Sequence, residues 1–169
     1  MNTTILNRRS YLAVIGFTTT GCLASGERSE PRPIGEKQHR DNIAMAATNI
    51  SPADSIEIEG TILEPQGENQ FALVEFWAQN LVNSQRTLPV AAETKLIIND
   101  TDYSMYQAEP ITEWNKLYSG GTVDSGVIRN GIIPFEVDQD ISERRIQFTI
   151  PPAAGNFDDA VSWALPSSS

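Results

Sequence analysis

The chain has 169 residues, a formal net charge of −10 and a single cysteine. One cysteine excludes an intrachain disulfide, so the fold has to rest on its own hydrophobic core. The acidic balance argues against nucleic acid as a partner, because phosphates require a basic surface, and against direct docking on anionic lipid. Residues 55–169 carry seventeen acids against six bases, and the whole chain has only three lysines. This composition predicts a surface that stays soluble at high salt, where charge repulsion is screened.

The N-terminus has the pattern of an export signal. Arg8 and Arg9 precede a short apolar run that leads to Gly21 and Cys22. A positive start, a short apolar run and a small residue before the cleavage point are typical of a signal peptide, and this run is too short to span a bilayer as a helix. The arginine pair predicts export of the protein in its folded state. Residues 1–21 are therefore predicted to be a twin-arginine signal peptide.

Gly21 and Cys22 resemble the end of a lipoprotein box, in which the cysteine accepts a diacyl lipid and becomes the new N-terminus. Thr19 departs from this box, which usually has leucine three residues before the cysteine. A twin-arginine signal joined to such a cysteine resembles the exported lipoproteins of salt-adapted archaea. The alternative is an ordinary free or buried Cys22. We expect a protein anchored to the outer face of the cell membrane by a lipid on Cys22.

The remaining chain divides into a tether and one domain. Residues 22–54 are rich in Gly, Pro, Ser and mixed charge, which predicts a flexible tether. Residues 55–169 suffice for one core. Apolar and polar residues alternate there with the period of half-buried strands, over residues 56–63, 71–80, 94–99, 102–105, 127–128, 133–137, 145–150 and 161–165. About seven strands without helical periodicity predict an all-β, immunoglobulin-like antiparallel sandwich.

Three stretches of the domain carry a family resemblance. Residues 117–121 form a glycine turn, Gly126 precedes a hydrophobic residue, and residues 133–137 contain Phe-Glu-Val. This succession resembles the secreted immunoglobulin-like domains of bacterial and archaeal lipoproteins, the telluride-resistance-associated or immunoprotective extracellular domain family. The resemblance covers roughly residues 55–165. The chain departs from the family by its insertion at residues 127–131 and by lacking cysteines between the sheets. The resemblance implies a binding or interaction module and supplies no catalytic residues.

The sequence offers few groups for catalysis. His39 is the only histidine, and it falls in the predicted tether, where it cannot belong to a rigid catalytic triad. Cys22 is expected to carry the lipid. The sequence also lacks clustered zinc ligands and a glycine-rich phosphate loop. We therefore expect a protein without enzyme activity and without a cofactor.

Paired carboxylates leave one alternative open. Hard oxygen ligands on loops can hold calcium, and the pairs are Asp100 with Asp102, Asp138 with Asp140, and Asp158 with Asp159. None of them follows the twelve-residue calcium loop, and aspartate also favours turns for its local hydrogen bonds. The first two pairs are weak calcium candidates. The corresponding alternative function is a solute-binding, metal-binding or hydrolytic surface lipoprotein.

Aromatic residues provide the candidates for a recognition surface: Trp77, Trp114 and Tyr118. Trp77 shares the expected wet face of its strand with Glu75, so its ring is placed to stack on a sugar or anchor a protein partner. The competing interpretation, which we favour from the sequence, is that a neighbouring loop such as the Trp114 region covers Trp77. Trp163 shares a strand face with Val161 and Leu165, which predicts a core position.

Two tripeptides, which begin at Asn49 and Asn99, match the glycosylation acceptor pattern. Asn49 lies in the predicted tether and is expected to be the more accessible of the two. Together these features predict a lipid-anchored, non-enzymatic, immunoglobulin-like module that binds an envelope protein, a glycan or a small ligand. A structural spacer without a partner is a further alternative.

Overall fold

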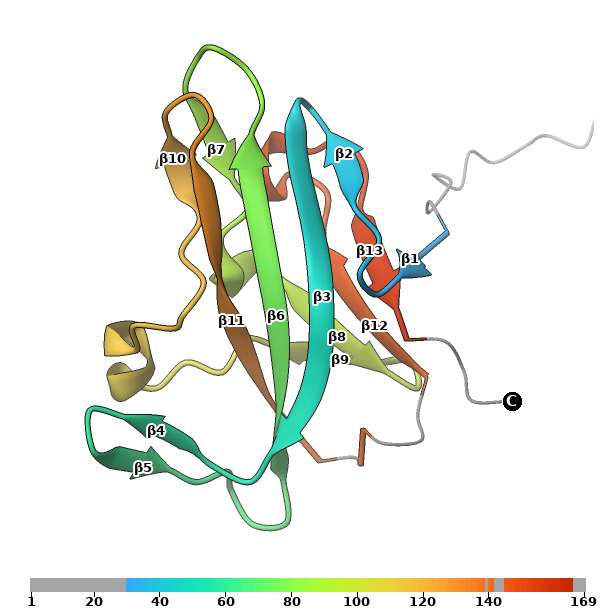
Figure 1. Cartoon of the computed structure of the whole chain (residues 1–169). Helices are drawn as coiled ribbons and strands as arrows, with labels where there is room; N and C mark the ends of the chain where they lie inside the picture. Colours follow the sequence, from blue (N-terminus) through green and yellow to red (C-terminus); the bar gives the residue numbers. More distant parts are fainter. Residues whose placement is uncertain (1–29, 139, 142–144, 166–169) are drawn as a thin grey trace, which may run out of the picture.

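The computed structural model describes residues 30–138, 140–141 and 145–165, and these residues form a two-layer β-sandwich (Figure 1). The all-β sandwich predicted from the alternating pattern is confirmed. It contains thirteen strands within the described ranges, several of them only two to four residues long, where the sequence predicts about seven. Arg8, Arg9 and Cys22 lie outside the described residues, so the predicted export signal and lipid site stay predictions.

The first layer is a four-stranded antiparallel sheet. Its strands in spatial order are β11 (Ile128–Val137), β6 (Gln70–Asn80), β3 (Ile43–Ala53) and β2 (Gln38–Arg40). The central strand β6 alternates as the sequence predicts: Val74 and Phe76 are buried, while Glu75 between them is exposed. Successive side chains of a strand point to opposite faces, so this pattern separates a core face from an outer face.

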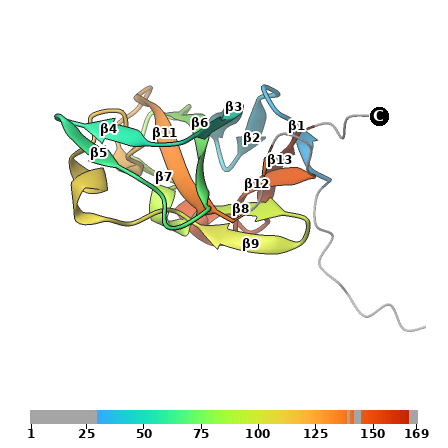
Figure 2. The ribbon, with the colours of Figure 1, turned by 90° about the horizontal axis from the view of Figure 1, so that it is seen from below.

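The second layer is a five-stranded sheet that lies below the first in Figure 2. Its strands in spatial order are β1 (Arg32–Pro33), β13 (Val161–Ala164), β12 (Ile146–Ile150), β8 (Lys95–Ile98) and β9 (Thr101–Ser104). All neighbours are antiparallel except β1 and β13, which run parallel. After β1 the chain passes into the first sheet, where β2 pairs with β3.

Two two-stranded antiparallel sheets and three 3-10 turns complete the domain. Their bounds are β4 (Ile56–Ile58), β5 (Thr61–Leu63), β7 (Arg86–Leu88), β10 (Gly121–Val123), η1 (Ala91–Glu93), η2 (Glu109–Glu113) and η3 (Ala154–Asn156). β4 contacts η2, and the β4–β5 hairpin projects from the lower end of the sandwich (Figure 1). In the part of the chain that the structure describes, no helix has the length and apolarity that a membrane span requires.

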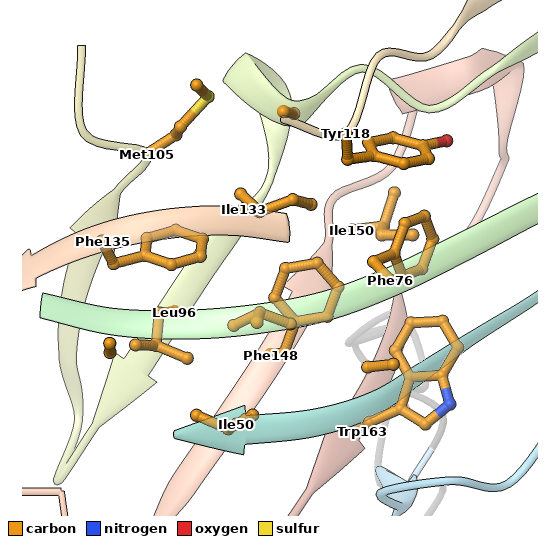
Figure 3. Packing of buried hydrophobic residues seen from close by; sticks show 14 of the residues in the cluster. Ile50, Phe76, Leu96, Met105, Tyr118, Ile133, Phe135, Phe148, Ile150 and Trp163 are labelled. Atoms are coloured by element: carbon orange, nitrogen blue, oxygen red, sulfur yellow. The ribbon is translucent and has the colours of Figure 1, made fainter. Parts of the chain in front are cut away.

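Aromatic residues from both sheets meet in the core (Figure 3). The ring of Phe76 lies 4.8 Å from Tyr118, 5.6 Å from Phe148 and 5.9 Å from Trp163, measured between ring centroids. Trp163 is fully buried, which confirms its predicted core position. Burying one large apolar side chain stabilises the folded state by about 1.5–3 kcal/mol. The contacts around Phe76 therefore hold the two layers together.

The tether predicted over residues 22–54 is wrong for the described residues 30–54. β3 is an inner strand of the first sheet, and residues 43–47 are buried on both faces. A strand covered on both faces loses its polar alternation, so Ala44–Ala47 gave no period-two signal. The folded domain accordingly includes β1, β2 and β3 and does not begin near residue 55.

Residues 32–40, the N-terminal strap, join the two sheets. β1 pairs with β13 in one sheet and β2 pairs with β3 in the other. Trp163 Nε1 donates a hydrogen bond to the carbonyl oxygen of Glu36 (2.7 Å), and Gln38 Nε2 donates to that of Ser162 (2.7 Å). Gly35 N donates to the carbonyl oxygen of Ala47 at 2.8 Å. These contacts fix the strap, and with it His39 on β2.

Candidate binding groove

Trp77 lies at the centre of the outer face of the first sheet. It is opposite Ala46 on β3 and Asn130 on β11, and its side chain is half-buried. The methyl side chain of Ala46 leaves room for the indole on this face. The predicted outward orientation of Trp77 is confirmed by its alternation with buried Phe76 and Ala78.

A hollow of about 490 Å³ lies beside the Trp77 side chain. We call this hollow the Trp77 groove; its lining combines hydroxyl, amide, carboxylate and ammonium groups with apolar atoms, and comes from Thr48, Glu75, Phe76, Trp77, Asn115, Lys116, Asn130, Gly131 and Ile132. These residues belong to β3, β6, β11 and the segment that follows η2. Concave sites with an aromatic wall and a few polar groups are the usual form of ligand sites in proteins.

Gly131 allows one wall of the groove to approach the sheet. A Cβ atom at this position would lie 2.5 Å from the Cα of Tyr118, which is far inside van der Waals contact. The absence of a side chain lets Ile132 N donate to the carbonyl oxygen of Lys116 (2.7 Å) and Tyr118 N donate to that of Ile132 (3.0 Å). This close approach places Asn115 and Lys116 at the groove.

The opposite wall depends on a β-bulge in β3. The register of β3 with β6 shifts between Ala47 and Asn49, so Thr48 is the extra residue. Thr48 is exposed, lines the groove and donates a hydrogen bond from Oγ1 to the carbonyl oxygen of Glu75 (3.4 Å). Asn49 Nδ2 donates to Glu75 Oε1 at 3.3 Å. The bulge thus turns a hydroxyl toward the site and engages the Glu75 carboxylate.

Lys37 of the strap lies over the Trp77 ring, with Nζ 5.3 Å from the ring centroid. A cation–π contact of this kind contributes about 0.5–1 kcal/mol at an exposed site. Neither Lys37 nor Lys116 forms a salt bridge with any residue in the described ranges. Of the three lysines of this acidic chain, Lys116 lines the groove, and Lys37, outside its lining, lies over the Trp77 ring.

Trp114 and Tyr118 do not form the recognition surface that the sequence predicts with Trp77. Trp114 is 8% exposed and Tyr118 is 1% exposed, so both belong to the core. Tyr118 packs edge-on against Phe76, and its hydroxyl has no hydrogen-bond partner within the described part of the chain. Burial raises the pKa of Tyr118 well above its usual value of about 10, and the nearby charge of Arg129 acts in the opposite direction.

The loop after η2 borders Trp77 but does not bury it. Asn115 and Lys116 line the groove, whereas Trp114 itself points into the core. The loop therefore covers Trp77 only in part, and not fully as the sequence interpretation predicts. Sequence reasoning missed Thr48, Asn130 and Lys116, because a bulge and a long-range backbone approach bring them to Trp77 and neither leaves a local pattern.

The carboxylates proposed for calcium mostly lie in a turn or contact another side chain. Asp100 lies in the two-residue β8–β9 turn at a positive φ of 66°, and Asp102 Oδ2 lies 3.1 Å from Lys95 Nζ. Asp138 accepts a hydrogen bond from the Tyr103 hydroxyl, while Asp140 is exposed. Across residues 30–138, 140–141 and 145–165, no three His, Cys, Asp or Glu side chains gather as a metal ion would need.

Both glycosylation sequons are exposed. Asn49 lies on β3 beside Glu75 and not in a tether, which corrects the position predicted for it. Asn99 lies in the β8–β9 turn at a positive φ of 47°. Their glycosylation stays a prediction. His39, placed in the tether by the sequence, is an exposed residue of β2 opposite Ala44.

Comparison with known proteins supports the fold. No family model and no curated protein matches the chain. Among solved structures, YjhA of Bacillus subtilis is 15% identical with a TM-score of 0.57, covering 80% of this chain and 99% of YjhA. The secreted protein MPT63 of Mycobacterium tuberculosis is 15% identical with a TM-score of 0.56, covering 80% and 98%.

A third similar structure is the candidate lipoprotein YcdA of Bacillus subtilis, which is 13% identical with a TM-score of 0.56. The match covers 76% of this chain but only 38% of YcdA, so the chain spans well under half of that protein. Similarity at such identities shows a shared β-sandwich and carries no residue roles.

Proposed function

We propose that this chain is a lipid-anchored, extracytoplasmic, immunoglobulin-like module without catalytic activity, which binds a ligand through the Trp77 groove. The observation that carries the proposal is the half-buried Trp77 ring beside a hollow of about 490 Å³. Three segments that are distant in sequence supply polar groups to this hollow. An aromatic wall with a few polar groups provides both contact area and orientation for a ligand.

The proposed location is supported by the sequence pattern at Arg8, Arg9 and Cys22. Two proteins of similar fold are described as a secreted protein and a candidate lipoprotein, which agrees with this location. Replacement Cys22→Ser is expected to move the protein from the membrane fraction to the medium, because the lipid acceptor is lost. Retention of this variant in the membrane fraction would argue against lipid anchoring.

The alternative of a metal-binding or hydrolytic lipoprotein has less support. Asp102 already contacts Lys95, and Asp138 already accepts a hydrogen bond from Tyr103. A calcium site would make the thermal unfolding temperature sensitive to chelator, since a bound ion stabilises only the folded state. We expect the melting curve to be the same with and without chelator.

Partner capture on intact cells tests the groove. The anchored protein is cross-linked at the native salt concentration of its cells, purified, and analysed for whatever it binds. Trp77→Ala is expected to lose the captured partner, because a buried aromatic anchor often dominates an interface. Leu81→Ala is the matched control, since Leu81 is 47% exposed and lies outside the groove. Equal capture by wild type and Trp77→Ala would move the function to a sheet edge or to a simple spacer.

A further inference from the structure

We propose that the ligand of the Trp77 groove is an acidic saccharide, a sugar that carries a carboxylate or a sulfate group. The sugar ring stacks on Trp77, and Lys37 and Lys116 neutralise its acidic group. This inference rests on the proposed function, because it identifies the ligand of the same groove.

The distribution of charge is the first support. Residues 55–169 carry seventeen acids against six bases, whereas the groove lining holds one acid and one base. Glu75 is the one carboxylate among the residues that line the groove, and Asn49 donates a hydrogen bond to it. Lys116 lines the groove and Lys37 lies over Trp77. A local excess of cations on an acidic protein attracts an anion and disfavours a cation.

The third lysine, Lys95, is placed differently from Lys37 and Lys116. Lys95 lies on the outer face of the other sheet, where its Nζ is 3.1 Å from Asp102 Oδ2. Lys37 and Lys116 have no such partner within the described residues. An unpaired lysine beside a groove keeps its charge available for a ligand, whereas Lys95 is already paired.

The remaining lining points to a ligand rich in hydroxyl groups. Thr48, Asn115 and Asn130 are exposed and present a hydroxyl and two amides, which both donate and accept hydrogen bonds. The Trp77 ring offers a flat apolar surface that suits the C–H face of a sugar ring. A peptide partner would instead need apolar pockets for its side chains, and the fully apolar side chains in the lining are Ile132 and buried Phe76.

Lys37 also predicts how the groove discriminates between sugars. Its ammonium group lies over the Trp77 ring, where a stacked sugar would compete with it. The lysine stem is flexible, so Lys37 can leave the ring and pair with an acidic group on the ligand. A neutral sugar that stacks on Trp77 displaces the Lys37 ammonium group and offers it no acidic group to pair with instead. Lys37 therefore favours acidic over neutral saccharides.

Calorimetric titration of the full chain carrying Cys22→Ser tests this inference with two probes that share their sugar rings and differ in charge and in the ester methyl groups. The probes are trigalacturonate and its methyl ester, and a sulfated disaccharide is added as a second acidic sugar. We expect trigalacturonate to bind about tenfold more tightly than the ester, the size of one charged hydrogen bond. Raising the salt from 0.15 M to 1 M shortens the screening length from about 8 Å to about 3 Å and should narrow this difference.

Five variants, one of them a control, locate the contacts. Lys116→Gln and Lys37→Gln should each weaken trigalacturonate binding severalfold to about tenfold, and Lys37→Gln should leave binding of the methyl ester equal or tighter. Lys95→Gln is the matched control and should leave both affinities unchanged. Trp77→Leu should weaken both probes about thirtyfold or more, as loss of an interface anchor does. Thermal unfolding of each variant separates loss of binding from loss of folding, and Trp77→Phe repeats the test with an aromatic ring retained.

Four outcomes overturn the inference, and only the last of them also overturns the proposed function. If the ester and trigalacturonate bind with equal affinity, and the lysine variants leave both affinities unchanged, the groove is a neutral-sugar site. Equal binding of triglutamate would show that acidic peptide suffices. Binding of neither acidic sugar, while Trp77→Ala still loses its cross-linked partner, would keep the groove as the binding site and exclude an acidic saccharide. If the Trp77 variants keep both the cross-linked partner and their affinity for the probes, both proposals are overturned.

Discussion

The outer faces of the two sheets use their polar side chains differently. On the five-stranded sheet the polar groups bind one another: Lys95 pairs with Asp102 (3.1 Å), and the hydroxyls of Thr149 and Ser162 share a hydrogen bond (3.1 Å). Gln147 Nε2 extends this row by donating to Thr149 Oγ1 at 3.0 Å. A face whose donors and acceptors are paired internally offers little to a ligand.

The four-stranded sheet pairs only part of its outer groups, such as Asn49 with Glu75. Trp77 is half-buried beside a hollow, and Lys37 and Lys116 form no salt bridge with the residues that the structure describes. Both faces belong to β-sheets in which buried and outward-facing side chains alternate, as in β6 and β12. The difference shows that the candidate site follows from a bulge, a glycine and the N-terminal strap, and not from the sandwich itself. Four substitutions test this comparison.

Gly131→Ala is expected to have the largest effect on stability. Its new Cβ would meet the Tyr118 backbone at 2.5 Å, so β11 and the segment 116–118 would have to separate. Such overpacking costs up to about 3 kcal/mol, measured by urea unfolding, and it should also weaken binding at the groove. Asn130→Ala, at the adjacent exposed position, should change stability by less than about 0.5 kcal/mol. A Gly131→Ala protein as stable as wild type would contradict the close approach.

Trp163→Phe should destabilise the domain by about 1–2 kcal/mol, through a smaller core ring and a lost hydrogen bond to Glu36. The strap should loosen in particular, so the amide of Gly35, which donates to Ala47, should exchange its hydrogen faster. Phe148→Leu reduces the same core without cutting the strap contact and serves as the control. If both variants expose the Gly35 amide equally, Trp163 does not anchor the strap.

Tyr118→Phe should leave stability unchanged or raise it by up to about 1 kcal/mol near neutral pH, because the buried hydroxyl has no partner in the described ranges. The folded-state pKa of Tyr118 is raised by burial. The contribution of Tyr118 to the free energy of unfolding is therefore intact below about pH 10. It falls as the pH rises further, by about 1.4 kcal/mol per pH unit. Denaturant unfolding from pH 8 to pH 11 should show a steeper loss in wild type than in Tyr118→Phe. Parallel pH curves for the two proteins would rule out a buried, protonated Tyr118.

Lys95→Gln should have the smallest effect. Lys95 and Asp102 have side chains 46% and 54% exposed, and an exposed ion pair contributes at most about 1 kcal/mol. A double-mutant cycle with Asp102→Asn, repeated at high salt, measures the pair and should show the coupling fade as salt screens it. A coupling that persists at 1 M salt would mean that this face is less solvated than its exposure indicates.

Period-two alternation identified several strands directly. The patterns over residues 71–80, 145–150 and 161–165 correspond to β6, β12 and β13, and they place Trp163 in the core and Trp77 outside. These predictions hold because a strand with one wet face shows its orientation in its own residues. Alternation did not identify residues 43–47 as a strand, because this part of β3 is covered on both faces and has no alternating polar residues.

The sequence by itself thus determined the class of fold, the central strands and the side of β6 on which Trp77 lies. Only the tertiary structure decided that Trp114 and Tyr118 are buried, that Thr48 bulges toward Trp77 and that Lys37 lies over its ring. The physical reason is distance along the chain. Alternation is local, whereas the groove depends on contacts between separate backbone segments, such as Gly131 with Tyr118, which lie too close for a single added Cβ atom.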